Sequence, residues 1–232
     1  KLAFVKPMLF PEEYAGENAE STDKVQADSK SVHAAQRNVI LIGRQFGSGG
    51  HDIGKALAEK LGYAFYDQEI IEMTAGTTGY TPEFIQKNEE MMTSSFLYDL
   101  VNQMYMYAQA DEEAPKDKIY EAESKVVKEL AEKGNCVIVG RCSDYVLRDN
   151  RNCLRVFFSA PMENRMKRVM ERLHLSEKDA RQKIQKEDKW RADNYRYYTG
   201  RIWGAAGNFD LTVNTALGED YIEMCIREAM KR

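Results

Sequence analysis

The residues with the clearest chemical potential are glycines that follow a short apolar run. Residues 39–42 are apolar β-formers, and residues 47–50, with the sequence GSGG, follow them as a glycine loop. Glycine adopts positive φ without strain and lets backbone N–H groups approach a bound group. Because the next residues read as a helix that begins near Ile53, the arrangement predicts a phosphate-binding site at a helix N-terminus.

The P-loop pattern G-x-x-x-x-G-K-[ST] can be placed here in a register that uses Gly49, Gly54 and Lys55, although Ala56 follows. Lys55 would then have to reach the phosphates. It lies about 200° around the helix from the predicted buried position of Ile53, so we expect it in solvent. We therefore reject this register.

The second register begins at Arg44, directly after the strand, and uses the glycine loop as its cradle. Gly50 then stands where a P-loop has its lysine, and His51 and Asp52 follow where a hydroxyl would help to hold magnesium. That lysine normally supplies charge to the β- and γ-phosphates. Its loss should matter unless Arg44, His51 or another cation replaces it. Asp52 can also cap the helix.

Strands and helices alternate from residue 39 onward, which predicts an α/β fold with a five-stranded, mostly parallel sheet covered by helices on both faces. The predicted strands are 39–42, 63–66, 137–139, 154–158 and 211–214, and the predicted helices are 53–61, 70–75, 82–92, 95–110, 116–133, 144–147, 161–173, 176–198 and 218–232. Ligands in such sheets bind beyond the carboxyl ends of the strands. The glycine loop, Asp67, Arg141 and Ser159 should therefore gather there.

The composition changes at residue 39. Residues 1–38 are polar behind a short apolar start, and we expect a tail or the remnant of an upstream segment. Since the sequence begins with Lys1 rather than Met, we expect a fragment or a processed form. Residues 39–232 form the predicted domain, in which residues 81–133 are a helical insertion without a strand signal.

Charge and hydropathy narrow the range of partners. The net charge of −4 gives no broad reason to expect nucleic acid or an anionic membrane, and no apolar run is long enough to span a membrane. The four cysteines are scattered and form no CxxC pair. We expect reduced thiols in a cytoplasmic protein and no metal site built by the chain alone.

One predicted helix carries Arg165, Arg168 and Arg172 in a narrow stripe beside its apolar face. Such a stripe suits phosphate binding, because arginine forms bidentate hydrogen bonds with phosphate. Surface pairing with Glu163 and Glu171 explains the stripe equally well.

Other charged residues also have two interpretations. Arg141 ends a buried strand, where function explains an arginine better than structure does. Asp67 is either a ligand contact or the N-cap of the next helix. Asp188 and Arg191 share a helix face with Tyr195, which also fits a solvated ladder of salt bridges.

Three motifs in order give the chain a resemblance to a known family. They are GRQFGSGGHDIG at 43–54, FYD at 65–67 and CVIVGRCSDY at 136–145. Together they resemble the cytidylate kinase-like family, which is related to the nucleoside monophosphate kinases. The resemblance covers about residues 39–232 and not the first 38. A glycine loop without lysine is usual in that family, with Arg common where His51 stands.

The resemblance implies a P-loop kinase fold with an acceptor-side helical segment and a lid at 160–200. It also implies roles for individual residues. The donor phosphates would be held by Arg44, Gly47, Ser48, Gly49, Gly50, His51 and Asp52, the acceptor would be bound by Asp67, Arg141 and Lys186, and the catalytic groups would be Arg141, Arg165, Arg168, Asp188 and Arg191.

The expected function is phosphoryl transfer from ATP, with Mg²⁺, to a nucleoside monophosphate, with CMP as the first choice of acceptor. Three alternatives stay open. The chain could be a nucleotide-binding regulatory module without catalysis, because Gly50 replaces the lysine. It could be a kinase of another small acceptor. It could also be an interaction protein whose segment 81–133 makes a homodimer.

Overall fold

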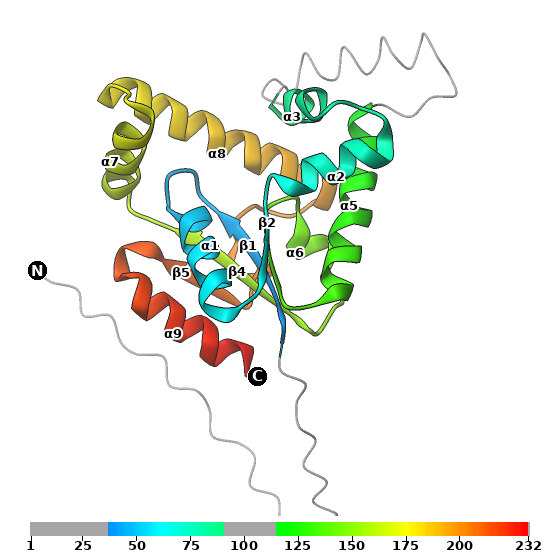
Figure 1. The fold of residues 1–232 in the computed structure, drawn as a ribbon. Coiled ribbons are helices and arrows are strands. Elements are labelled where there is room, and N and C mark those ends of the chain that lie inside the picture. Colours follow the sequence, from blue (N-terminus) through cyan, green and yellow to red (C-terminus); the bar gives the residue numbers. More distant parts are fainter. Residues whose placement is uncertain (1–36, 91–114, 232) are drawn as a thin grey trace, which may run out of the picture. The chain divides into compact units, whose positions relative to one another are not determined.

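The computed structural model describes residues 37–90 and 115–231, and these form an α/β fold (Figure 1). Its sheet has five strands in the order β2-β3-β1-β4-β5, and every neighbouring pair is parallel. The strands are β1 (Val39–Arg44), β2 (Ala64–Tyr66), β3 (Cys136–Val139), β4 (Cys153–Ser159) and β5 (Leu211–Asn214). The predicted α/β class is confirmed, and the described sheet is parallel throughout.

Strand β1 lies in the middle of the sheet, which explains its run of apolar residues. Residues 39–42 have no exposed surface. Ile40 and Ile42 pack on one side against α1 (Gly50–Leu61) and α9 (Glu219–Met230). Val39 and Leu41 pack on the other side against α2 (Glu69–Thr78) and α5 (Pro115–Lys133). Helices therefore cover both faces, as the sequence predicts.

Helices α7 (Met162–Leu173) and α8 (Glu177–Thr199) pack on each other through a smaller apolar cluster that also receives Phe46 from the glycine loop. Ser176 caps α8, because its hydroxyl accepts the N–H of Asp179 at 3.2 Å. The remaining described α-helices are α3 (Pro82–Glu90) and α6 (Ser143–Val146), and short 3-10 helices lie at Ala206–Asn208 and Thr215–Leu217.

One predicted helix start is wrong. Helix α1 begins at Gly50 rather than near Ile53, and its N-cap position is Gly49, with φ of 86°. A glycine in this left-handed conformation turns the chain into the helix three residues early. Asp52 is consequently inside the first turn and is not the cap. The predicted helix 95–110, the end of 82–92 and residues 1–36 of the tail lie outside the described residues.

The four cysteines carry free thiols. Cys136 and Cys153 begin β3 and β4, and both lie opposite Val39 of β1. Burial raises the pKa of the Cys136 thiol to about 12 and that of Cys153 to about 11. Among the described residues, no three histidine, cysteine or acidic side chains gather as a metal site, and no helix there is long and apolar enough to cross a membrane.

Candidate active site around the glycine loop

The glycine loop connects β1 to α1 and is shaped by its close approach to α7. Gly47 has φ of 74°, and a methyl group there would lie 2.8 Å from the Val169 side chain. Ser48 is fully buried and its carbonyl accepts the Thr215 hydroxyl at 2.6 Å. In the first turn of α1, the Gly50 N–H donates to the Ser48 hydroxyl at 3.4 Å and the Ile53 N–H donates to the Gly49 carbonyl at 3.0 Å. The N-terminus of α1 lies at the loop, and a helix N-terminus is the kind of position that binds anions.

Arg165 and Asp188 hold the loop by its backbone. The Phe46 N–H donates to Asp188 at 2.8 Å, and Arg165 Nε donates to the Phe46 carbonyl at 2.8 Å. The two side chains also form an ion pair with each other. Because the side chain of Arg165 is only 5% exposed, it positions the loop from behind. Arg165 therefore pairs with Asp188 rather than with Glu163 or Glu171 at the surface. We call Arg165 and Asp188, which both bind the Phe46 backbone, the buried clamp.

Arg168 lies over the loop. Its guanidinium donates to the Gly47 carbonyl at 2.9 Å and would meet a methyl group on Gly49 at 2.8 Å. Arg172, further along the same stripe, is exposed and pairs with Asp52 at 3.4 Å. The arginine stripe therefore runs from the buried clamp, across the loop, to the surface.

Asp67 joins Arg44 to His51. One carboxylate oxygen lies 2.8 Å from His51 Nδ1, and the other lies 3.5 Å from the Arg44 guanidinium. The N-cap position of α2 is Gln68, so Asp67 is not that cap. Its carboxylate instead orients the side chains of Arg44 and His51 at the sheet edge.

Arg141 stands in an unusual turn after β3. Gly140, Arg141 and Cys142 have consecutive positive φ values of 81°, 57° and 49°. Non-glycine residues in this conformation cost energy and tend to cluster at functional sites. The Arg141 side chain lies 3.6 Å from the carboxylate of Glu123 on α5, so α5 takes part in the site.

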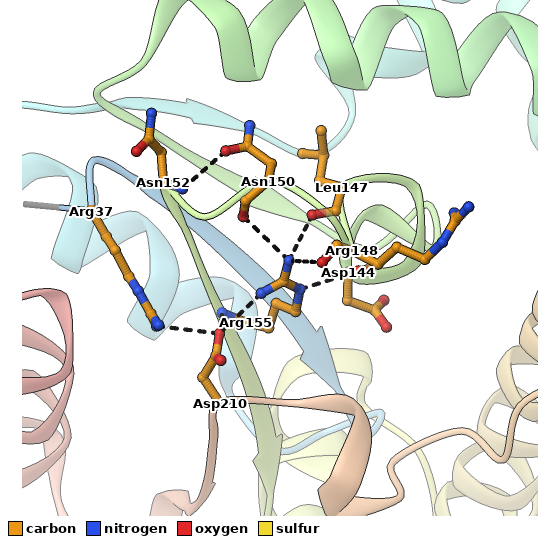
Figure 2. Close-up of polar contacts among 8 residues, drawn as sticks. All are labelled: Arg37, Asp144, Leu147, Arg148, Asn150, Asn152, Arg155 and Asp210. Atoms are coloured by element: carbon orange, nitrogen blue, oxygen red, sulfur yellow. Dashed lines mark hydrogen bonds and ion pairs between the residues drawn. The ribbon is translucent and has the colours of Figure 1, made fainter. Parts of the chain in front are cut away.

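Arg155 fixes the segment that follows this turn (Figure 2). From β4 it donates to the carbonyls of Leu147 at 2.7 Å and of Arg148 at 2.6 Å, and it lies 3.4 Å from the carboxylate of Asp210. It also donates to the backbone carbonyl of Asp144 at 3.4 Å. The sequence did not reveal this role, because most of the partners are backbone carbonyls, which any residue type supplies, and Asp210 is 55 residues away.

The side chain of Asp144 is buried against α8. It accepts the Tyr195 hydroxyl at 2.6 Å. Burial raises the pKa of Asp144, and the hydrogen bond from Tyr195 opposes that rise. Burial also raises the pKa of Tyr195. The pair links α6 to α8 beside Arg141.

Two pockets meet at this edge of the sheet. The loop pocket contains Gly47, Gly49, Gly50, His51, Asp52 and Arg168. The aromatic pocket contains Tyr120, Glu123, Arg141, Asp144, Trp190, Asn194, Tyr198, Trp203 and Phe209. Arg44 and Arg191 line both pockets. The structure thus places two cations where the pockets join.

Arg191 lies directly beside Arg44. Its guanidinium donates to the Arg44 carbonyl at 3.2 Å. Burial, followed by the neighbouring charge of Arg44, lowers the pKa of Arg191 to about 9. An anion bound here would offset the repulsion between the two arginines.

Most of the residues predicted for the site line these two pockets. Five of them line neither: Ser48, Asp67, Arg165, Asp188 and Lys186. The first four hold or flank the loop, whereas Lys186 stands apart from the pockets. It is exposed on α8. The sequence analysis did not identify the residues of α8 that line the aromatic pocket. These are Trp190, Asn194 and Tyr198, which recur every fourth residue, a helical spacing from which they could have been predicted to share a face.

Residues 39–217 match the cytidylate kinase-like family. This chain belongs to that family. It is 29% identical over 180 residues to a cytidylate kinase from Ignicoccus hospitalis, and the match covers 77% of this chain and 90% of that protein. A crystal structure of an uncharacterized protein from Eubacterium ventriosum is 27% identical with a TM-score of 0.61, covering 83% of this chain and 97% of that one.

A shikimate kinase from Bacteroides thetaiotaomicron has a TM-score of 0.49 at 15% identity, covering 84% of this chain and 98% of that one. Membership of the cytidylate kinase-like family, together with the parallel sheet and its glycine loop, identifies the fold as that of the P-loop kinases. The family supports a nucleotide kinase, and hence a phosphotransferase.

Proposed function

We propose that this chain transfers a phosphoryl group from ATP to a nucleoside monophosphate, with CMP as the expected acceptor. The observation that carries the proposal is the sharing of Arg44 and Arg191 by the loop pocket and the aromatic pocket. Phosphoryl transfer needs alignment of donor and acceptor and stabilisation of charge on the moving group. Cations at the junction of two pockets meet that need.

The glycine loop and the N-terminus of α1 would hold the donor phosphates. The loop fits this role because it passes so close to α7 that methyl groups at Gly47 and Gly49 would collide with Val169 and Arg168. Turns of this glycine-rich kind present backbone N–H groups to anions. Mg²⁺ in such sites binds mainly through phosphate oxygens and water, with one or two carboxylates. Asp52 in the loop pocket is a carboxylate that could serve. When bound, Mg²⁺ offsets the phosphate charge.

The aromatic pocket would take the acceptor. Trp190, Trp203 and Phe209 offer flat walls for a base, while Arg141 would grip its phosphate. The preference for CMP rests on the family and on the Ignicoccus hospitalis relative. The segment 81–133 would be the acceptor-side elaboration, since Tyr120 and Glu123 of α5 line this pocket.

Residues 160–200 would form the lid region. Arg168 and Arg191, from α7 and α8, line the loop pocket, so movement of this helix pair would change access to the phosphates. Arg165 and Asp188 would act by positioning the loop, because their polar atoms contact the Phe46 backbone and each other. Closure of such a region excludes water from the phosphates.

The test is an ADP-release assay with ATP and, in turn, CMP, dCMP, UMP and AMP. We expect turnover that is fastest with a cytidine nucleotide. Arg141→Ala should raise the KM for the acceptor, while Lys186→Ala is a matched control that removes an exposed charge from the lid region. Turnover with none of the four acceptors would contradict the proposal.

A second candidate function is nucleotide binding without catalysis. The observation that favours it is Gly50 at the lysine position, together with the use of Arg165 inside the protein. Calorimetric titration with ATP distinguishes the two: heat of binding without ADP release for any acceptor would establish the binding module.

A further inference from the structure

Arg44 and Gly50, which are the first and seventh positions of the P-loop pattern, lie against each other. A methyl group on Gly50 would be 2.8 Å from Arg44 Cβ and 3.3 Å from Arg44 Cγ. Cβ is fixed by the backbone, so Arg44 cannot yield by changing rotamer. The side chain of Arg44 thus occupies space that a lysine at position 50 would need.

The backbone does not prevent a side chain at position 50. Gly50 is the first residue of α1 and is not among the glycines with positive φ. The other close neighbour is Phe158, whose ring would lie 3.0 Å from the added methyl group. Arg44 Cβ at 2.8 Å is the closer of the two neighbours, and it is fixed by the backbone, so Arg44 is the main obstacle. Only one of the two positions can carry a long side chain.

The guanidinium of Arg44 reaches the region between the two pockets. It lies 3.5 Å from Asp67, and its Nη1 would be 2.5 Å from a methyl group on Gly140, at the end of β3. Gly140 precedes Arg141, which lines the aromatic pocket. The Arg44 side chain therefore leaves the backbone at the beginning of the loop, and its charged guanidinium lies beside the predicted acceptor site.

The neighbouring arginines are less suited to replace the lysine. Arg165 binds the Phe46 carbonyl and Asp188 from behind the loop. Arg168 lines only the loop pocket, and Arg191 donates to the Arg44 carbonyl. Arg44 alone among these combines contact with Gly50, a partly exposed side chain and a position at both pockets.

Building on the proposed function, we propose that Arg44 is the cation that replaces the P-loop lysine. The consensus pattern has glycine at its first position and lysine at its seventh. This chain has the reverse, with arginine first and glycine seventh. Positions 44 and 50 would thus have exchanged the cationic side chain and the glycine. The arginine at the start of the loop would fill the space that the lysine at its end fills in the consensus pattern.

The steric part of this proposal is tested by melting temperature, without substrate. Gly50→Ala should lower the melting temperature of the wild-type protein by about 5 °C, as expected for overpacking. In the Arg44→Gly background the same substitution should cost much less, because Arg44 Cβ is gone. An equal fall in melting temperature in both backgrounds would overturn the proposal that Arg44 occupies the space of a side chain at position 50.

The charge part is tested by the affinity for a non-hydrolysable ATP analogue. Loss of a charge-assisted phosphate contact in Arg44→Gly should weaken binding about 10- to 100-fold. Arg44→Gly/Gly50→Lys, which restores the consensus pattern, should recover at least about fivefold of that loss, whereas Gly50→Lys alone should weaken binding. Lys55→Ala, an exposed charge on α1, is the matched control.

Arg44→Met distinguishes the effect of the charge from the effect of the space that the side chain fills. It can also be used if Arg44→Gly does not fold. It keeps the stem but lacks the charge, so it should bind weakly and should not be rescued by Gly50→Lys. Wild-type affinity in Arg44→Gly or Arg44→Met, or rescue of Arg44→Met, would overturn the proposal. If the wild-type protein turns over no acceptor, the proposed function fails, while melting and affinity still decide the exchange.

Discussion

At the scale of single residues, the charged groups of the site divide into those that hold the protein and those that face the pockets. Asp188 and Arg165 belong to the first group, because they bind the Phe46 backbone and each other. Arg44 and Arg191 belong to the second, since both line the two pockets. The helix spacing of Arg165, Asp188 and Arg191 does not separate the groups, because hydrogen-bond partners more than a hundred residues away decide their roles.

Asp188→Ala should destabilise the protein by about 2–4 kcal/mol, because it leaves Arg165 buried without its carboxylate. The Phe46 N–H also loses its acceptor. The free energy of unfolding, measured in urea, checks this prediction. Lys189→Ala removes an exposed ion pair with Asp193 on the same helix and should change stability by less than about 0.5 kcal/mol. Equal stability of the two variants would contradict the clamp.

Asp144→Asn should change how stability depends on pH. Burial raises the pKa of Asp144 above its ordinary value of 3.8. The contribution of this carboxyl to stability is therefore fully present below about pH 3.8 and is lost as pH rises through the folded-state pKa. The variant cannot ionise, so its free energy of unfolding should rise relative to that of the wild-type protein as pH increases above about 4.

Chemical denaturation at several pH values measures this difference. Asp149→Asn is the control, because that side chain is 91% exposed and should give a nearly flat difference. A flat difference for Asp144→Asn as well would show that the carboxyl has the same pKa in the folded and unfolded states.

At the scale of elements, the loop before α1 and the C-cap of α1 each contain a glycine in the left-handed conformation. Gly47, in the loop before α1, has φ of 74° and faces Val169. Gly62, the C-cap, has φ of 67° and has no atom within 4 Å of an added methyl group. The two positions demand the same backbone conformation but differ in the space around them.

Gly47→Ala should therefore cost about 2–4 kcal/mol and weaken nucleotide binding, since it adds a steric collision to the backbone strain. Gly62→Ala should cost only the strain, about 1–2 kcal/mol, and leave binding unchanged. Urea unfolding and calorimetric titration with ATP measure the two effects. Similar losses of stability and binding in both variants would show that packing of the loop against α7 is unimportant.

The alternation of strand-like and helix-like apolar patterns was sufficient to predict most strands and helices of the described structure. Strand 211–214 has the predicted bounds, and α5 begins one residue before its prediction. The start of α1 was not predictable, because Gly49 serves both as loop glycine and as helix cap. The role of Arg155 was also not predictable, since a single arginine in an apolar strand does not reveal that its partners are Asp210 and the carbonyls of the 147–150 turn.

At the scale of the whole described structure, β1 belongs to both the core and the site. Its first four residues are fully buried between two apolar clusters, and its last residue, Arg44, begins the loop. The alternation of strands and helices predicts a parallel sheet but not its strand order, which depends on the crossover connections. That order, with β1 between β3 and β4, brings Arg141 beside Arg44.

The thiols provide a test of this central packing. Cys225 is partly exposed and should react quickly with an alkylating reagent, while Cys136 and Cys153 are buried and have raised pKa values. Since the thiolate is the reactive form, these two should be modified only when the sheet opens. Mass spectrometry of time-resolved labelling measures the rates. Equal rates for Cys136 and Cys225 would contradict the buried packing of β3 against β1.

The position of Cys136 and Cys153 on either side of Val39 has a consequence for measuring binding. A ligand that binds only the folded state reduces the population of the opened state by a factor of 1 + [L]/Kd. When reclosing is faster than labelling, the modification of these two thiols should slow by that factor as nucleotide is added. Each candidate nucleotide could therefore be ranked by a protection factor at the far end of β1, whether or not any phosphoryl group moves.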